Sequence, residues 1–132
     1  MKLKIITATK TVLELDNILQ VNIPGVDGVL GILPGHIDII TPLKEGTLMY
    51  RLDNNKKVVV IKGGIAKLKN DYLLILADDA EVPENLIREQ IEESIKNAEH
   101  KIASGELEFT ELIQLEKQLR YERIKQMSLE NT

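Results

Sequence analysis

Short alternations of apolar and polar residues dominate the first 83 positions of the chain. The apolar residues Leu19, Val21 and Ile23, for example, are separated by single polar ones. A period of two is typical of β-strands, because successive side chains point to opposite faces of a sheet. Further stretches predict strands at residues 3–7, 29–32, 37–41, 47–52, 57–62, 65–69 and 72–76.

Turn-forming residues separate these stretches. Glycine, proline, asparagine and aspartate favour turns, since they adopt or impose backbone angles that strands avoid. The expected turns are at Pro42, Glu45-Gly46, Asp53-Asn54-Asn55, Gly63-Gly64 and Asn70-Asp71. About eight short strands with tight turns and no helix between them predict an antiparallel β-sandwich or flattened barrel.

The apolar pattern changes to a helical period after residue 83. Five apolar residues follow one another at steps of four, four, three and four, which places them on one face of a helix. They are Ile87, Ile91, Ile95, Ala98 and Ile102. Asn85 is the expected N-cap of this helix, and Ser104-Gly105 is its expected end.

A second helix is expected to begin near Thr110, whose hydroxyl would cap it, with Glu111 in the first turn. Its apolar residues are Leu112, Ile113, Leu115, Leu119, Ile124 and Met127. The short connection at residues 104–109 favours an antiparallel helical hairpin. Neither helix is apolar on all sides, so we expect the hairpin to be an appendage that is able to move.

Composition divides the chain at the same place. Residues 1–83 contain all seven aspartates, seven of the eight glycines and all four prolines, whereas residues 84–132 are rich in glutamate. Glutamate is tolerated in helices, while glycine, proline and aspartate favour turns. We therefore expect an α+β chain, with an N-terminal antiparallel β-sandwich at residues 1–83 and a C-terminal antiparallel two-helix hairpin at residues 84–132.

Several classes of function are disfavoured by composition. The chain has no cysteine, so it offers no thiol nucleophile, disulfide or thiolate metal site. A net charge of −4 and the absence of tryptophan argue against nucleic acid as the main partner. The uninterrupted apolar runs are far shorter than the roughly 20 residues that span a bilayer, so any membrane association is expected to go through a partner.

Candidate catalytic groups are few. His36 and His100 are the only histidines, and His100 lies in a charged stretch typical of a solvated helix face. Asp78, Asp79 and Glu81 form an acidic cluster without a neighbouring histidine, which indicates a solvated turn more than a metal site. No nucleophile and base can be assembled from these residues, so an enzyme is the least supported of the alternatives.

The segment at residues 23–36 contains four glycines and two prolines between apolar residues. A phosphate-binding loop would lead from a strand into a helix, and no helix is expected to follow these glycines. The segment is therefore predicted to consist of specified turns around a short strand. Its order of residues is Pro24-Gly25, Asp27-Gly28 and Gly31-Ile32-Leu33-Pro34-Gly35-His36, followed by Thr41-Pro42-Leu43.

These motifs resemble the epsilon subunit of bacterial F-type ATP synthases. Further matches follow in order along nearly the whole chain. They are Val60-Ile61-Lys62-Gly63-Gly64, Leu76-Ala77-Asp78-Asp79-Ala80-Glu81 and Ala98-Glu99. The resemblance implies a non-catalytic rotor subunit of the central stalk, peripheral to the cytoplasmic face of the bacterial plasma membrane. Its implied partners are the gamma subunit, the c-ring and, in an extended state, the catalytic alpha and beta subunits.

The resemblance also implies where the sandwich meets the c-ring. The matching residues are Val29, Leu30, Gly31, Ile32, Leu33, Pro34, Gly35 and His36. His36 matches the histidine of the family. Val29 stands where many members have an acidic residue, so this chain departs from the family at that position.

ATP sensing is the alternative function, because some bacterial members bind ATP on the folded hairpin through the motif I/L-D-x-x-R-A. Here Ile87 replaces the aspartate and Gln90 replaces the arginine. Glu81, Arg88 and Arg120 are the remaining candidates for nucleotide contact. Each lost charged hydrogen bond would remove about 1.5–3 kcal/mol, or one to two decades of affinity. We therefore expect no cofactor, and weak or absent ATP binding.

The second helix carries basic residues with two interpretations. Local pairing on the helix surface, such as Glu116 with Arg120 at i,i+4, is the default. By resemblance, Lys117, Arg120 and Arg123 would instead meet acidic residues of a catalytic subunit when the hairpin extends, and would restrain ATP hydrolysis. Such a switch requires two arrangements within a few kcal/mol of each other.

Overall fold

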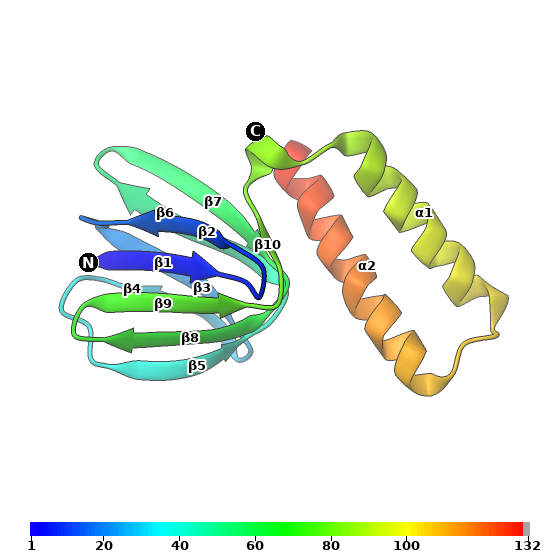
Figure 1. Ribbon diagram of the computed structural model, residues 1–132, viewed down its shortest axis with the longest axis horizontal. Helices are drawn as coiled ribbons and strands as arrows, with labels where there is room; N and C mark the ends of the chain where they lie inside the picture. The colour runs from blue at the N-terminus through cyan, green and yellow to red at the C-terminus, as the bar shows by residue number, and fades with distance from the viewer. Residues whose placement is uncertain (131–132) are drawn as a thin grey trace. The chain divides into compact units, whose positions relative to one another are not determined.

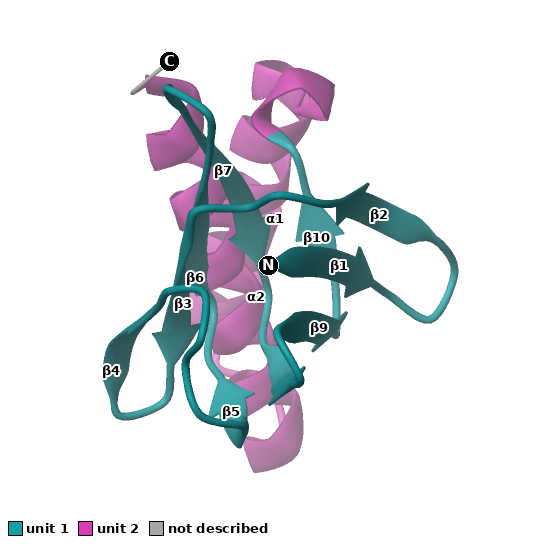
Figure 2. Cartoon of the chain, turned by 90° about the vertical axis from the view of Figure 1, so that its left-hand side faces the viewer, with its two compact units in different colours: residues 1–82 teal, residues 83–132 magenta. Residues whose placement is uncertain are grey.

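The computed structural model describes residues 1–130 of the chain (Figure 1). The chain divides into two compact units, Met1–Val82 and Pro83–Thr132, which are coloured separately in Figure 2. This division lies one residue before the one expected from composition. The first unit consists of strands and the second of helices, as the two periods of the apolar pattern predict.

The first unit contains ten strands. They are β1 (Lys2–Ile6), β2 (Thr11–Leu15), β3 (Gln20–Gly25), β4 (Gly28–Ile32), β5 (Ile39–Leu43), β6 (Gly46–Leu52), β7 (Asn55–Ile61), β8 (Gly64–Lys69), β9 (Tyr72–Ala77) and β10 (Ala80–Glu81). Their order in the sheet is β10-β7-β6-β3-β5-β8-β9-β1-β2, and β4 pairs with β3 outside this path.

Strand β3 joins the two layers of the sandwich. Its first residues pair with β6, whereas Gly25 pairs with Leu43 of β5. The sheet therefore folds back on itself, with β7, β6 and β3 on one side and β2, β1 and β9 on the other (Figure 2). The predicted β-sandwich or flattened barrel is confirmed.

One apolar core fills the space between the layers. Its fully buried side chains include Leu3, Ile23, Leu48 and Ile75, which come from four different strands. Fully burying a side chain of this size stabilises the fold by about 1.5–3 kcal/mol. The core is thus built from the inward positions of the alternating pattern.

Three details of the strands differ from expectation. The pattern does not predict β2, because a shift of register against β1 interrupts its alternation and both Val12 and Leu13 pack against the core. Pro42, expected at a turn, lies inside β5 opposite Ile65. Strands β1 and β9 pair in parallel, whereas the other strand pairs of residues 1–130 are antiparallel.

The alternation of Leu19, Val21 and Ile23 does not correspond to one buried face. Leu19 is exposed, whereas its neighbour Ile18 is fully buried. Asn17 has a φ of +61°, and β3 begins only at Gln20, so the alternation of the strand does not extend back to Leu19. The Ile18 N–H donates to the Met1 carbonyl at 2.9 Å, which holds this turn against the start of the chain.

The second unit is an antiparallel helical hairpin. A short 3₁₀ helix, η1 (Pro83–Asn85), precedes α1 (Arg88–Ser104) and α2 (Phe109–Glu130). Ile91, Ile95 and Ala98 of α1 pack with Leu119 of α2 in a narrow buried seam. Gly105 ends α1 with a φ of +70°, as expected for a C-terminal glycine.

Both expected helix caps are wrong. Asn85 belongs to η1, and the N-cap position of α1 is Ile87, which is extended, exposed and makes no side-chain cap bond. Helix α2 already includes Phe109, so Thr110 lies within its first turn. In α2, Ile113 and Met127 are exposed, because the seam takes only a narrow stripe of that helix.

Candidate docking surface

The segment at residues 24–36 forms a hairpin followed by a tight turn. Strands β3 and β4 pair in antiparallel register, with Pro24 opposite Val29 and Val21 opposite Ile32. The chain reverses between the two strands, and Gly28 supplies the φ of +129° that begins β4. The glycines of this segment therefore serve backbone geometry, as the sequence indicates.

Strand β4 presents only part of the predicted contact to the surface. Val29 is 76% exposed and Gly31 is exposed, whereas Ile32 is fully buried and Leu30 packs partly against the core. Alternation along the strand is the reason. The c-ring contact at residues 29–36 stays a prediction, in which Ile32 is buried in the core of the sandwich and Leu30 packs partly against it.

Val29 and the turn at Leu33 are separate features. Leu33 lies four positions after Val29 along an extended segment, which corresponds to about 13 Å at 3.3 Å per residue. Val29 lies beside the β3–β4 reversal, whereas the turn lies at the other end of β4. The predicted contact of residues 29–36 thus consists of two exposed sites joined by a half-buried strand.

The turn after β4 has the geometry of a type II β-turn. The His36 N–H donates to the Leu33 carbonyl at 3.1 Å, which closes the turn around Pro34 and Gly35. Proline favours the first central position, and the second requires a positive φ, which Gly35 supplies at +86°. The turn leaves Leu33 56% exposed, which gives it an apolar corner.

His36 is half-buried and bonded to its own segment. Its Nδ1 lies 2.7 Å from the Ile37 carbonyl oxygen. Because a carbonyl oxygen only accepts, Nδ1 carries the proton of this hydrogen bond. The ring therefore stiffens the turn, in addition to any contact it makes with a partner.

Exposed apolar residues continue beyond the turn, outside the segment that the sequence motifs indicate as a site. Ile37 is 76% exposed and Ile40 is 70% exposed. The expected strand at residues 37–41 treats both as ordinary strand residues. The only signal in the sequence is an apolar side chain near the Gly35-His36 turn. That signal indicates a surface site only when the exposure of each side chain is known from the structure.

A second exposed surface, here called the outer sheet face, was also missed by sequence reasoning. Cross-strand pairing aligns Ile6, Pro42, Ile65 and Leu76 in one row across β1, β9, β8 and β5. Ile65 and Leu76 are exposed. Lysines project beside this row at the alternate positions of the same strands: Lys2, Lys4, Lys67 and Lys69. This face is therefore apolar and positively charged, although the chain as a whole is acidic.

The basic residues expected to meet the catalytic head all lie on α2. Arg123 and Arg120 are exposed, and Lys117 is half-buried. Arg123 Nη2 lies 3.8 Å from Glu99 Oε2 of α1, so its pairing crosses the hairpin and is not local to α2. An exposed ion pair of this kind stabilises by about 0–1 kcal/mol.

A polar cluster lies along one side of α2. The carboxylate oxygen Glu122 Oε1 accepts from Gln118 Nε2 at 2.8 Å and from Lys125 Nζ at 3.3 Å. Lys125 Nζ also lies 4.4 Å from the ring centre of Tyr121. Glu122 is only 5% exposed, so these partners satisfy a charge that would otherwise be costly to bury.

The nucleotide candidates come from different units. Glu81 lies in β10 of the sandwich, where its Oε1 is 3.8 Å from Lys10 Nζ. Arg88 is the first residue of α1 and Arg120 is in α2 of the hairpin, and both are exposed. Ile87 and Gln90 are exposed as well, and neither carries a charge.

Groups for catalysis or metal binding do not gather in the described part of the chain. His100 lies exposed on α1, in the other unit from His36. Among residues 1–130, no three side chains of histidine, aspartate or glutamate come together as metal ligands. Within the same residues, no helix has the length and apolar character needed to cross a membrane.

The chain thus combines a β-sandwich that has exposed apolar turns with a charged helical hairpin. The family model for the ATP synthase delta/epsilon chain β-sandwich domain matches residues 1–83. The chain belongs to the epsilon-chain family, the central-stalk epsilon subunits of F-type ATP synthases. The resemblance drawn from the sequence motifs is confirmed.

Two relatives illustrate the similarity. The ATP synthase epsilon chain of Koribacter versatilis is 37% identical over 102 residues, which cover 77% of this chain and 71% of the relative. The ATP synthase epsilon chain of Bacillus subtilis is 34% identical over 103 residues, which cover 78% and 77%.

Solved structures share the fold of the whole chain. A chain in the cryo-EM structure of the Euglena gracilis mitochondrial ATP synthase, comprising OSCP, F1 and c-ring in rotational state 1, aligns with a TM-score of 0.80 at 22% identity. The alignment covers 96% of this chain and 79% of that one. A chain in the central stalk and c-ring of the Tetrahymena thermophila mitochondrial enzyme aligns with a TM-score of 0.63 at 12% identity, over 98% and 96%.

Proposed function

We propose that this epsilon-chain member couples c-ring rotation to the gamma subunit and the catalytic head during ATP synthesis, and that its hairpin restrains ATP hydrolysis. The observation that carries the proposal is the family match over residues 1–83. The sandwich that these residues form carries the Leu33–His36 turn, in which Leu33 is exposed. Through these partners the chain would sit peripherally on the cytoplasmic face of a bacterial plasma membrane.

The Leu33–His36 turn is the proposed contact with the c-ring. Leu33 and the adjacent Ile37 offer exposed apolar area on a closed turn. Burying about 100 Å² of such area contributes about 2.5 kcal/mol. Val29 is a second proposed point of contact, at the other end of β4.

The gamma subunit would bind the outer sheet face. An apolar row with flanking lysines fits a partner surface that has an apolar centre and acidic margins. This face and the Leu33–His36 turn involve different residues. The sandwich is therefore able to hold two partners at once, which coupling requires.

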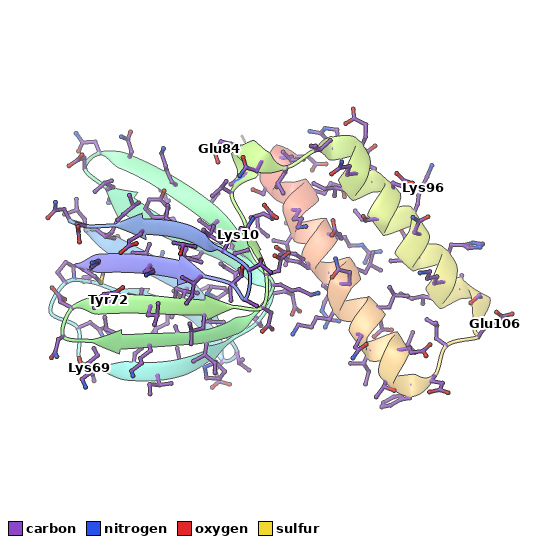
Figure 3. All side chains as sticks on the ribbon, viewed as in Figure 1. Lys10, Lys69, Tyr72, Glu84, Lys96 and Glu106 are labelled. Atoms are coloured by element: carbon purple, nitrogen blue, oxygen red, sulfur yellow. The ribbon has the colours of Figure 1, made fainter. Side chains whose placement is uncertain are left out.

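Cross-linking in the assembled synthase tests the c-ring contact. Because the chain has no cysteine, one introduced cysteine gives a unique attachment point. A cysteine at His36 is expected to cross-link to a c subunit, whereas one at Lys96, which projects from α1 in Figure 3, is expected not to.

A second single-cysteine variant, Val29→Cys, distinguishes the two sites of contact. Reaction at both positions 29 and 36 supports a contact along the whole of β4. If position 29 reaches the ring and position 36 does not, the proposed role of the turn is wrong. If neither position reaches it, the docking surface lies elsewhere on the sandwich.

Inhibition by the hairpin is supported by the narrow apolar seam between its two helices. Few side chains are fully buried in its seam, and the Arg123–Glu99 pair is exposed. The buried charge of Glu122 has its partners, Gln118 and Lys125, on the same helix. Helix α2 would therefore keep these partners when it separates from α1, which lowers the cost of extension.

ATP sensing is the function we consider weaker, and titration of ATP into the full chain tests it. Ile87 and Gln90 provide no charged contact for a nucleotide. We expect a Kd in the millimolar range or no binding, measured by calorimetry. A micromolar Kd would contradict this expectation and favour the nucleotide-sensing alternative through Glu81, Arg88 and Arg120.

A further inference from the structure

Two aspartates tie the apolar turn to a distant hairpin. The Gly35 N–H donates to Asp71 Oδ1 at 2.8 Å, and the Asn70 N–H donates to Asp38 Oδ1 at 3.0 Å. The first bond joins residues that are 36 positions apart in the sequence, and the second joins residues that are 32 apart. The two bonds run in opposite directions, because each of the two segments supplies one backbone donor and one aspartate acceptor. We call this pair of bonds the aspartate clasp.

The hairpin side of the clasp is firmly placed. Asn70 and Asp71 form the two-residue turn between β8 and β9, with φ values of +50° and +63°. Lys69 and Tyr72 flank this turn and pair with each other (Figure 3). The Asp71 carbonyl also accepts from the Lys2 N–H at 3.0 Å, so the turn is bonded to β1 as well.

The other side of the clasp is the segment between β4 and β5. Residues 33–38 contribute two internal bonds, from the His36 N–H to the Leu33 carbonyl and from His36 Nδ1 to the Ile37 carbonyl. These bonds close and stiffen the turn but do not fix its direction relative to the sheet. The bonds of Gly35 and Asp38 to the β8–β9 turn supply this direction, because they lie on either side of the half-buried His36 and the exposed Ile37.

We infer that Asp38 and Asp71 are positioning residues, which hold the Leu33–Ile37 segment in one conformation before any partner binds. The inference rests on the proposed c-ring contact for its functional consequence. An apolar segment that is already ordered loses less conformational entropy on docking. Hydrogen bonds with an ionised carboxylate are roughly twice as strong as neutral ones, which suits a bond that is exposed to water.

Backbone dynamics of the full chain test the clasp without any partner. Amide order parameters of Gly35, His36 and Ile37 are expected near 0.85 in the natural chain, as in rigid backbone, and below about 0.6 in Asp71→Ala and Asp38→Ala. Asp71→Asn keeps an oxygen acceptor and is expected to restore most of the order.

Asp53→Ala is the matched control. Asp53 also lies in a hairpin turn with a positive φ, +54°, so alanine meets the same backbone penalty there as at Asp71. No hydrogen bond or ion pair of its carboxylate occurs among residues 1–130. Equal order parameters at Gly35–Ile37 in the Asp53→Ala and Asp71→Ala proteins would overturn the clasp, whatever the ring contact does.

Rebinding of the full chain to a synthase depleted of it tests the functional consequence. Loss of the clasp by Asp71→Ala is expected to weaken binding about tenfold relative to Asp53→Ala, with recovery in Asp71→Asn. Disordered amides together with unchanged affinity would overturn the positioning role. Failure of the proposed ring contact is recognised separately, because a cysteine at position 36 then forms no cross-link even in the natural, clasped chain.

Discussion

Replacing Gly64 with alanine is expected to lower the free energy of unfolding of the sandwich by about 3–5 kcal/mol. Gly64 begins β8 with a φ of +138°, a value that residues with a side chain rarely adopt. A Cβ at this position would lie 2.0 Å from the Leu76 carbonyl oxygen and 2.9 Å from the Ala77 Cα. These are backbone atoms of β9, so the strand pair itself would have to move apart.

Gly28→Ala is the control for this substitution. Gly28 has a similar φ of +129°, but a Cβ there would meet nothing within 4 Å. Its cost is therefore the backbone strain alone, about 1–3 kcal/mol. Urea denaturation of both variants measures the difference. Equal losses would mean that β8 and β9 absorb the contact freely, and would contradict the close approach between them.

Removing the hairpin after Pro83 is expected to raise ATP hydrolysis by the assembled synthase while ATP synthesis continues. The core of the sandwich is formed by residues of the first unit, so the shortened chain retains it. Typical coupling energies between regulatory states of about 1–3 kcal/mol correspond to an increase of about 5- to 150-fold. Hydrolysis rates of complexes with full and shortened chains measure the effect.

Charge reversal on the intact chain separates the basic residues from the rest of the hairpin. Arg120→Glu with Arg123→Glu is expected to release hydrolysis nearly as much as truncation does. Lys96→Glu with Lys101→Glu makes the same change of charge on exposed positions of α1 and is expected to leave the rate near that of the natural chain. For the truncation, a rate of hydrolysis that stays unchanged in complexes with the shortened chain would contradict the inhibitory role of the hairpin and leave the coupling role of the sandwich intact.

The strands were largely predictable because the core requires them to alternate. Buried positions such as Leu3, Ile23 and Ile75 are separated from other inward positions by one residue, and this spacing is visible in the sequence. Strand β2 escaped prediction because a shift of register against β1 leaves two successive residues, Val12 and Leu13, packed against the core, which interrupts the alternation. The expected cap at Asn85 is wrong because Asn85 belongs to η1, and α1 begins only at Arg88.

The candidate site was predictable as a segment but not as a surface. Motif order identified residues 29–36, and turn chemistry indicated Pro34-Gly35. Burial then divided this segment, since Leu30 and Ile32 face inward while Val29 and Leu33 face outward. Inward or outward direction depends on strand register, and register depends on partners elsewhere in the chain.

By itself, the sequence determined the division into strands and helices, the hairpin and the family, because each depends on local spacing or on ordered motifs. The tertiary structure alone decided the parallel pairing of β1 with β9, the outer sheet face and the aspartate clasp. The parallel pairing and the clasp join residues that lie thirty or more positions apart, and the outer sheet face combines residues of four strands. Their bonds form only when the folded core brings distant turns and strands together, so no local pattern records them.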